Sequence, residues 1–414
     1  MAKKTIVNTD QTDPYELDKS NHTWVFSEGH QFNGQDNSIH QASTFTNDTV
    51  IINGRVYSGA ASGSGIFFQG TDSKIIVSKT GSVTGALGID AEGDNMLVTN
   101  NGIVTSNSFT PAIYMSGANA HAVNNGHLFG VGGIEMASEG GVVDNNGTIN
   151  AYLTGIQFDS GGAIANLGKN SVITALSEGI DVASSIGQKT TVTNNGLIAT
   201  ADVTAFGGAD GDEILINHGT IRGDVTLGAG KDVFNNLDGK YSGDIFGGAG
   251  NDTFIVNSAK TQINELSAEG TDTVRSTVSF SLNTNALMAS EIENLTLLGT
   301  KNLNATGNNT QNVIKGNSGD NVLSGGVQND LLTGGKGHDT FIFATNFDSD
   351  EVSDFHKGVD KVDLSGMVDI ANFKDMMKNH VSEVGNDLYI TSGADNLILD
   401  HTSKADLHAS DFIF

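Results

Sequence analysis

The chain has 414 residues, 53 glycines, two prolines, no cysteine and a formal net charge of −27. Without cysteine it has no disulfide framework, no cysteine-bound zinc and no thiol nucleophile. Its 48 acidic against 21 basic residues disfavour nucleic acid and anionic membranes as partners and favour cations. A hydrophobic content of 37% is low for one compact domain of this length, so a regular, extended architecture is expected.

The start of the chain lacks the features of an N-terminal export signal. Two lysines occur within the first ten residues, but no apolar h-region follows them. No stretch of about eighteen apolar residues occurs anywhere, so no membrane span is expected. Residues 1–44 are polar apart from a short run at Trp24, Val25 and Phe26. We expect this segment to form a cap over the repeats that follow, with a disordered start as the alternative.

A short phrase of aliphatic residues around Asn-Gly recurs through residues 45–262. Its glycines fall at positions 54, 81, 102, 126, 147, 168, 196 and 219. Short β-rich pieces at this spacing, joined by turns whose Asn and Gly tolerate positive φ, are typical of a right-handed parallel β-helix. The alternative is a β-sandwich whose hairpins use Asn-Gly turns. We favour the all-β solenoid, because hairpins need not keep a regular period.

The period then tightens to twenty residues at Asp212, Asp232 and Asp252. Stacking in register places such carboxylates roughly 5 Å apart. Two charges at that distance repel by about 0.8 kcal/mol in water, and by about 3 kcal/mol at an effective dielectric constant near 20. A stack of these carboxylates is therefore stable only if it is fully solvated or binds a cation. We include Asp212 and Asp232 among the candidate metal ligands.

A nine-residue pattern, G-G-x-G-x-D-x-U-x, carries the most specific signal. Gly247–Ile255 and Gly334–Ile342 match it at every position, and Gly325–Thr333 lacks only the third glycine, where Gln328 stands. Two earlier copies carry Asn321 and Asn312 at the position of the aspartate. Residues 307–342 are therefore expected to form a calcium β-roll, preceded by a connecting β segment at 263–306. The alternative is a flexible Gly-rich linker, which four copies in phase disfavour.

The residue types explain why such a pattern suits calcium. Glycines allow a tight turn whose carbonyls converge, the aspartate adds a carboxylate oxygen, and the large apolar residue fills the core. Ca²⁺ takes six to eight oxygen ligands, whereas zinc or copper favours His or Cys. Besides Asp212 and Asp232, the expected ligand positions are Gly247, Gly248, Gly250, Asp252, Gly325, Gly326, Asp330, Gly334, Gly335, Gly337 and Asp339. The three turns with Asn312, Asn321 and Gln328 are weaker candidates.

These nonapeptides resemble the RTX, or hemolysin-type, calcium-binding proteins that Gram-negative bacteria secrete through type I systems. The segments at 269–274 and 291–297 resemble a stretch that often precedes RTX blocks. Asp354–Ser365 is similar to the C-terminal domain of serralysin-type proteins, and Asp411–Phe414 resembles a type I secretion terminus. The resemblance implies a secretion and capping domain at 343–414, export by the type I machinery and an extracellular location. Residues 366–381 show helical spacing and predict one short helix.

The resemblance also suggests how secretion and calcium are linked. In a cytosol with sub-micromolar Ca²⁺ the acidic roll stays unfolded and exportable. Outside, millimolar Ca²⁺ binds and its binding energy becomes folding energy.

An enzyme needs a site, and the sequence offers little. None of the 11 histidines is followed by glutamate, so the H-E-x-x-H zinc motif of serralysins is absent. Asp90, Glu92 and Asp94, or Asp159 and Asp181, are candidate paired carboxylates on one face, although turn carboxylates are usually only solvated.

We therefore expect a secreted, non-enzymatic calcium-binding protein with a display surface for adhesion, a matrix or a surface coat. Its expected partners are calcium ions and an extracellular polysaccharide or a cell surface. The alternative is a polysaccharide-active β-helix enzyme, a lyase or an epimerase. A third interpretation is an effector that binds a host surface.

Overall fold

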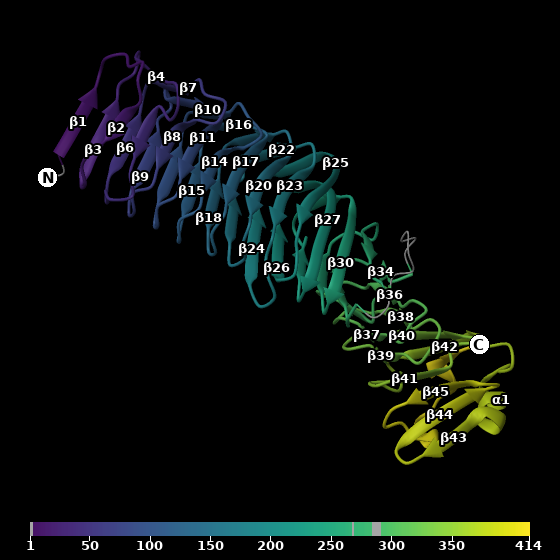
Figure 1. Ribbon diagram of the computed structural model, residues 1–414. Helices are drawn as coiled ribbons and strands as arrows, with labels where there is room; N and C mark the ends of the chain where they lie inside the picture. The colour runs from purple at the N-terminus through teal and green to yellow at the C-terminus, as the bar shows by residue number, and fades with distance from the viewer. Residues whose placement is uncertain (1–2, 267–268, 284–290) are drawn as a thin grey trace. The chain divides into compact units, whose positions relative to one another are not determined.

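A computed structural model of the chain describes residues 3–266, 269–283 and 291–414. Its strands are short, and most pair in parallel (Figure 1). The chain divides into two compact units. The first comprises Met1–Phe234 with Asp238–Asp244, and the second comprises Asn235–Leu237 with Ile245–Phe414. The expected all-β parallel solenoid is confirmed, and the sandwich of hairpins is wrong because the repeats pair in parallel.

The first unit is built from three columns of parallel strands, and each coil of the chain adds one strand to each column. Column one contains β1 (Lys3–Val7), β3 (His22–Phe26), β6 (Thr49–Ile52), β9 (Lys74–Val77), β12 (Leu97–Asn100), β15 (His121–Asn124), β18 (Val142–Asn145), β21 (Ile164–Leu167), β24 (Lys189–Asn194) and β26 (Asp212–Asn217). Column two contains β4 (Gln31–Gly34), β7 (Arg55–Ser58), β10 (Ser82–Gly85), β13 (Ile103–Ser106), β16 (His127–Gly130), β19 (Thr148–Ala151), β22 (Val172–Ala175), β25 (Leu197–Gly207), β27 (Thr220–Gly230) and β29 (Lys240–Ser242). Column three contains β2 (Tyr15–Leu17), β5 (Ile39–Gln41), β8 (Ser64–Phe68), β11 (Leu87–Ala91), β14 (Pro111–Met115), β17 (Gly132–Met136), β20 (Thr154–Phe158) and β23 (Glu178–Val182), and the second halves of β25 and β27 extend it.

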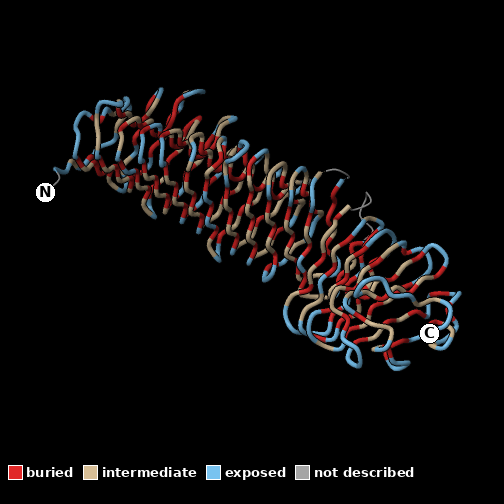
Figure 2. Tube along the Cα trace, turned by 90° about the horizontal axis from the view of Figure 1, so that it is seen from below, coloured by how far each residue is buried: buried red, intermediate tan, exposed pale blue. Residues whose placement is uncertain are grey.

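The core of the first unit is a narrow stack of aliphatic side chains. Val, Ile and Thr suit pleated, half-buried strands, and most strands of column one alternate buried and accessible positions (Figure 2). Val98 and Ile75, for example, are adjacent in register and both fully buried. One coil cannot cover its own apolar side, so the stability of each coil depends on its neighbours.

The asparagines of the Asn-Gly phrase form side-chain hydrogen bonds between successive coils. Asn100, Asn124 and Asn145 are fully buried and stack in register. The Asn100 side-chain amide donates to Asn124 Oδ1 at 2.9 Å, and that of Asn124 donates to Asn145 Oδ1 at 2.8 Å. Asn194 donates to Asn217 in the same way at 2.8 Å. These contacts form a buried amide ladder along the corner that follows column one.

The glycines of the same phrase are needed for close approach, and the expectation of positive φ is wrong for them. Positive φ is found at other glycines of the described chain, and Gly102, Gly126 and Gly147 do not adopt it. A Cβ at Gly126 would overlap the carbonyl oxygen of Gly102, and one at Gly147 would overlap that of Gly126. The corners of successive coils therefore stack backbone against backbone.

The second unit continues in parallel strands that are mostly shorter. One column contains β31 (Thr253–Val256), β33 (Thr273–Ser276), β35 (Asn294–Leu297), β37 (Val313–Lys315), β39 (Leu331–Thr333) and β41 (Ser349–Val352). The other contains β34 (Phe280–Ser281), β36 (Asn304–Thr306), β38 (Val322–Ser324), β40 (Thr340–Ala344), β42 (Lys361–Gly366) and β46 (Phe412–Ile413). Strand β32 (Gln262–Asn264) lies between β31 and β33 in sequence, and β28 (Val233–Asn235) and β30 (Asp244–Gly250) span the division between the units.

The end of the second unit departs from the solenoid. Strands β43 (Val381–Val384), β44 (Asp387–Ser392) and β45 (Asp395–Leu399) form an antiparallel meander, and β45 pairs with β41. The short helix expected within 366–381 is present as α1 (Phe373–Asp375) continued by a π turn, η1 (Met376–His380). Two short 3-10 turns, η2 (Lys404–Asp406) and η3 (Ala409–Asp411), follow. Across the described ranges, no helix has the length and apolar character needed to cross a membrane.

Candidate calcium site

The nonapeptides of the second unit form turns that only glycine fits easily. Gly326, Gly335 and Gly337 have φ of 115°, 94° and 130°, in the region that residues with a Cβ rarely adopt. Each turn leads into a strand whose eighth-position side chain fills the core. Ile314, Leu323, Leu332 and Phe341 occupy that place in successive copies, and all four are fully buried. The apolar residue anchors each turn and fixes where its sixth residue points.

The sixth-position aspartates are buried and linked to the preceding coil. Asp330 and Asp339 are 2% and 1% exposed. Asp330 Oδ1 accepts a hydrogen bond from the Asn312 N–H at 2.7 Å, and Asp339 Oδ1 accepts one from the Asn321 N–H at 2.7 Å. The same contact is repeated one coil later, because the Asp330 N–H donates to Asp350 Oδ1 at 2.8 Å.

The second oxygen of each aspartate points back into its own glycine turn. A Cβ at Gly325 would overlap Asp330 Oδ2, and one at Gly334 would lie against Asp339 Oδ2. Asp330 Oδ2 is buried and accepts no hydrogen bond from the described residues. Burial raises the pKa of Asp330 to about 7 and that of Asp339 to about 6. A buried carboxylate oxygen beside backbone carbonyls is a donor set that fits Ca²⁺.

The two asparagine turns satisfy their polar groups without a cation. Asn312 Nδ2 donates to the Ile292 carbonyl at 2.9 Å, and Asn321 Nδ2 donates to the Leu303 carbonyl at 3.1 Å. Their Oδ1 atoms accept from the N–H groups of Asn308 and Asn317 within the same turns, both at 2.8 Å. A carboxylate has no N–H donor for such carbonyls, whereas an amide has one. The side-chain amide thus makes the stabilising contacts in these turns that a metal ion would otherwise make.

The first nonapeptide, Gly247–Ile255, lies beside further acids. Gly248 and Gly250 have φ of 94° and 140°. Asp252 is 1% exposed, and its N–H donates to Asp272 Oδ1 at 2.8 Å. The carboxyl oxygens of Asp252, Glu265 and Asp272 lie within 4.8 Å of one another.

Asp212 and Asp232 do not face each other in the first unit. Asp232 Oδ1 accepts from the N–H of Glu213 at 2.6 Å, whereas Asp212 Oδ1 accepts from the N–H of Lys231 at 3.0 Å. Glu213 is fully buried and Asp232 is 1% exposed, while Asp212 is partly accessible. Burial raises the pKa of both Glu213 and Asp232 to about 7. The buried acidic pair is thus Glu213 with Asp232.

A row of polar side chains runs along the outer face of column three. In register it reads Asp90, Tyr114, Glu135, Gln157 and Asp181. Burial, the largest cause, raises the pKa of Asp90 and Glu135 to about 7 and that of Asp181 to about 6. Asp90 was predicted in one acidic group with Glu92 and Asp94, and Asp181 in another with Asp159. Glu135, which lies in register between Asp90 and Asp181, was not predicted.

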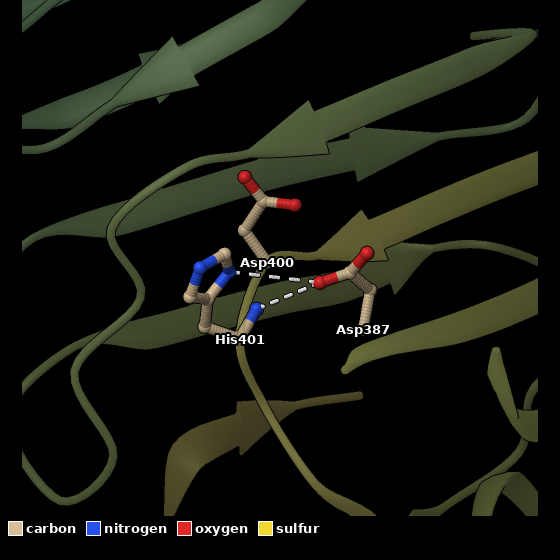
Figure 3. A group of neighbouring side chains, drawn as sticks. All are labelled: Asp387, Asp400 and His401. Atoms are coloured by element: carbon tan, nitrogen blue, oxygen red, sulfur yellow. Dashed lines mark hydrogen bonds and ion pairs between the residues drawn. The ribbon is translucent and has the colours of Figure 1, made fainter. Parts of the chain in front are cut away.

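A third acidic group lies in the C-terminal meander (Figure 3). Asp387 Oδ1 accepts from the His401 N–H at 3.0 Å and lies 3.7 Å from His401 Nδ1, with Asp400 beside them. The His401 side chain is 84% exposed. Because the group is open to water and already internally paired, its geometry does not by itself define a metal site.

Three buried acidic residues that the sequence pattern does not indicate as ligands share one signal. Each accepts a hydrogen bond from a backbone N–H about one coil length away, as the predicted ligand Asp232 also does. The three residues are Asp272, Asp350 and Asp360. The offsets vary from 19 to 21 residues, so a search for one fixed period does not find them.

Together, the glycine turns and inward carboxylates define a parallel β-solenoid with calcium-type nonapeptide turns. Residues 244–258 and 306–341 match a family model described as the RTX calcium-binding nonapeptide repeat (4 copies). The chain therefore contains RTX calcium-binding nonapeptide repeats in these two ranges, and the expectation of Ca²⁺ as the bound ion is confirmed.

Among solved structures, the chain is similar to the extracellular lipase LipA from Serratia marcescens, with 15% identity and a TM-score of 0.22. The match covers 61% of this chain and 45% of the lipase, so it spans less than half of that protein. A search of curated proteins finds no match.

Proposed function

We propose that this protein is secreted, that calcium completes its folding after export, and that the first unit then serves as an extracellular binding surface. The observation that carries the proposal is Asp330, whose buried Oδ2 points into its own glycine turn and accepts no hydrogen bond from any described residue. Leaving a carboxylate in that place costs free energy unless it is protonated or binds a cation. Millimolar Ca²⁺ outside the cell supplies that cation, and sub-micromolar Ca²⁺ inside does not.

Export is proposed through a type I system, with residues 343–414 as the secretion and capping domain. The support is the resemblance of Asp354–Ser365 and Asp411–Phe414 to RTX proteins of this kind. In this region Asp354 accepts hydrogen bonds from the N–H groups of Gly334 and Gly335, at 2.7 and 2.8 Å. Calcium binding in the last full nonapeptide and ordering of this segment are therefore expected to be coupled.

The proposed binding surface lies on the corner between columns two and three of the first unit. Phe109 is 89% exposed, Tyr152 is 60% exposed and Leu176 is 41% exposed. Successive corners are joined by backbone hydrogen bonds, such as Leu153 N–H to the Val131 carbonyl at 2.7 Å. Exposed aromatic side chains suit the apolar faces of sugar rings, so we propose an extracellular polysaccharide or a glycan-rich cell surface as the partner.

The calcium-dependent part of the proposal is tested by limited proteolysis of the full chain, in chelator and in millimolar Ca²⁺. We expect cleavage within residues 306–341 in chelator and protection in calcium. Adhesion is tested separately by co-sedimentation with insoluble polysaccharide or intact bacterial cells, with the F109A and Y152A variants compared with the wild type. Equal cleavage in both buffers would refute calcium-driven folding, and equal retention of the variants would refute this binding surface.

A second candidate function is a polysaccharide-active enzyme, favoured by one observation. Burial, and after it the charge of Asp159, raises the pKa of Glu135 to about 7, which allows Glu135 to carry a proton near neutral pH. Many enzymes that act on glycans use two carboxyl groups as proton donor and acceptor. Incubation with a polysaccharide panel, with product absorbance and reducing ends measured, tests this function. Turnover that is lost in E135Q would support it, and no turnover of any polysaccharide would count against it.

A further inference from the structure

Two groups of at least three acidic or histidine side chains that could hold a metal ion occur among the described residues, and the one around the first nonapeptide is fully buried. Asp252 immediately precedes β31, Asp272 immediately precedes β33, and Glu265 follows β32. Strands β31 and β33 pair in register, with Thr253 opposite Thr273. Two successive coils therefore bring Asp252 and Asp272 together, and the intervening segment adds Glu265. The exposed fractions are 1%, 0% and 1% for Asp252, Glu265 and Asp272.

Glu265 provides an observation independent of the clustering. Its side chain is fully buried, and neither carboxyl oxygen makes a hydrogen bond of good geometry to any residue that the structure describes. Burial is the largest cause that raises the pKa of Glu265 to about 9, and the charges of Asp272 and Asp252 act in the same direction. The N–H of Gly248 has the smallest effect and lowers the pKa. Buried polar groups of folded proteins nearly always have a partner, so such a carboxyl group needs an explanation.

The residues around Glu265 pack closely against its carboxyl group. A Cβ at Gly247 would overlap Glu265 Oε1, so only glycine leaves room for this carboxyl group. The Phe254 ring closes the same space, since its Cζ lies 2.7 Å from where that Cβ would be. Asp272 is held in place by the Asp252 N–H at 2.8 Å.

Among the ion pairs of the described residues, none involves Glu265 or Asp272. The donor set consists of carboxylate oxygens, which suits a hard cation such as Ca²⁺ and disfavours zinc or copper.

We propose that Asp252, Glu265 and Asp272 together bind one Ca²⁺, with Glu265 as a ligand that lies outside every nonapeptide. The inference rests on the calcium binding stated under Proposed function and extends it to a site that the repeat pattern does not describe. Two of the three ligands, Glu265 and Asp272, lie beyond residues 244–258, where the family match ends. The site would join two coils and the segment between them.

The test is calorimetric titration of the full, chelator-treated chain with CaCl₂, combined with thermal unfolding in both buffers. In E265Q we expect one fewer Ca²⁺ per chain, or binding at this site weakened by about tenfold or more. The calcium-induced rise in Tm should shrink. The Tm in chelator should not fall, because glutamine replaces a buried acid with a neutral group of the same shape. E139Q, which removes the same charge from an exposed position, should behave as the wild type.

A second variant keeps all three acids. In G247A the added methyl group would displace the Glu265 carboxyl group, and we expect the same loss of one Ca²⁺. If E265Q does not fold, the Ca²⁺ stoichiometry of G247A tests the site instead. Wild-type stoichiometry and affinity in a folded variant would overturn the site but leave calcium binding at Asp330 and Asp339 intact. A wild-type chain that binds no Ca²⁺ at all would overturn both this site and the proposed function.

Discussion

Asp339 Oδ1 accepts a hydrogen bond from the backbone N–H of Asn321, 18 residues earlier, at 2.7 Å. One oxygen of the carboxylate thereby links two turns of the roll, while the other faces the glycines of its own turn. The aspartate therefore has a structural role, and we propose that its second oxygen has a metal-binding role at the same time. Its replacement by asparagine separates these two roles, because Asn321 and Asn312 show how an amide fits the same turn.

The variant D339N should lose calcium binding without losing the fold of its turn. The amide keeps an oxygen for the Asn321 N–H but removes the negative charge that attracts the ion. We expect the calcium affinity of this turn to fall by about tenfold or more in a calorimetric titration. D13N, at an exposed position of the first unit, is the charge-matched control. Unchanged binding in D339N would show that the sixth position does not ligate calcium.

The opposite change, N321D, should create a calcium dependence that the wild-type turn lacks. The variant loses the amide that donates to the Leu303 carbonyl and to Asn317 Oδ1, so the calcium-free chain should be less stable by about 1–3 kcal/mol. Calcium should restore most of that loss. Denaturant unfolding of N321D and wild type, in chelator and in calcium, measures both effects. A loss of stability that calcium does not reverse would contradict the interpretation.

The buried amide ladder of the first unit should contribute to stability independently of calcium. In N124A, Asn100 loses its acceptor and Asn145 loses its donor, at an expected cost of about 1–3 kcal/mol. The neighbouring Asn125 makes a similar bond to Asn101 at 3.0 Å, but it is exposed. N125A should therefore cost much less. Equal losses in the two variants, measured by denaturant unfolding, would mean that burial of the ladder is unimportant.

The row on column three should make stability depend on pH. The pKa of Glu135 is raised from 4.5 to about 7 in the folded chain, mainly by burial. Between those values the folded state holds a proton that the unfolded state releases, so this contribution to stability is complete below about pH 4.5 and is lost as the pH rises through about 7. Thermal unfolding of E135Q in chelator, at pH 5 and at pH 8, should show a smaller fall in Tm than the wild type. An identical fall would mean that Glu135 titrates normally.

Features that depend on residues close together in the sequence could be predicted. The nonapeptide turns were recognised because glycine and the apolar residue at position eight are required locally. Phe254 and Phe341 occupy that position and are fully buried. The short helix near Met376 was likewise visible in the spacing of apolar residues.

Other features depend on how coils stack, which the sequence does not display. A shift of one residue reverses which side chain of a strand faces inward, so Glu213 rather than Asp212 meets Asp232. The sequence places Gly126 in a turn, but glycine is needed there because of contact with Gly102 one coil earlier, not because of positive φ. Glu265 belongs to no motif, and only the packing of Phe254 and Gly247 around it reveals that it is buried.

The central claim, that calcium completes the fold of the nonapeptide roll, is tested most directly by far-UV circular dichroism of the full chain during a calcium titration from chelator. We expect the β signal to increase with Ca²⁺, and the midpoint to move to higher calcium in a chain that carries both D330N and D339N. The signal already present in chelator would then belong to parts that fold without the ion. A spectrum that is the same in chelator and in millimolar Ca²⁺ would contradict the account.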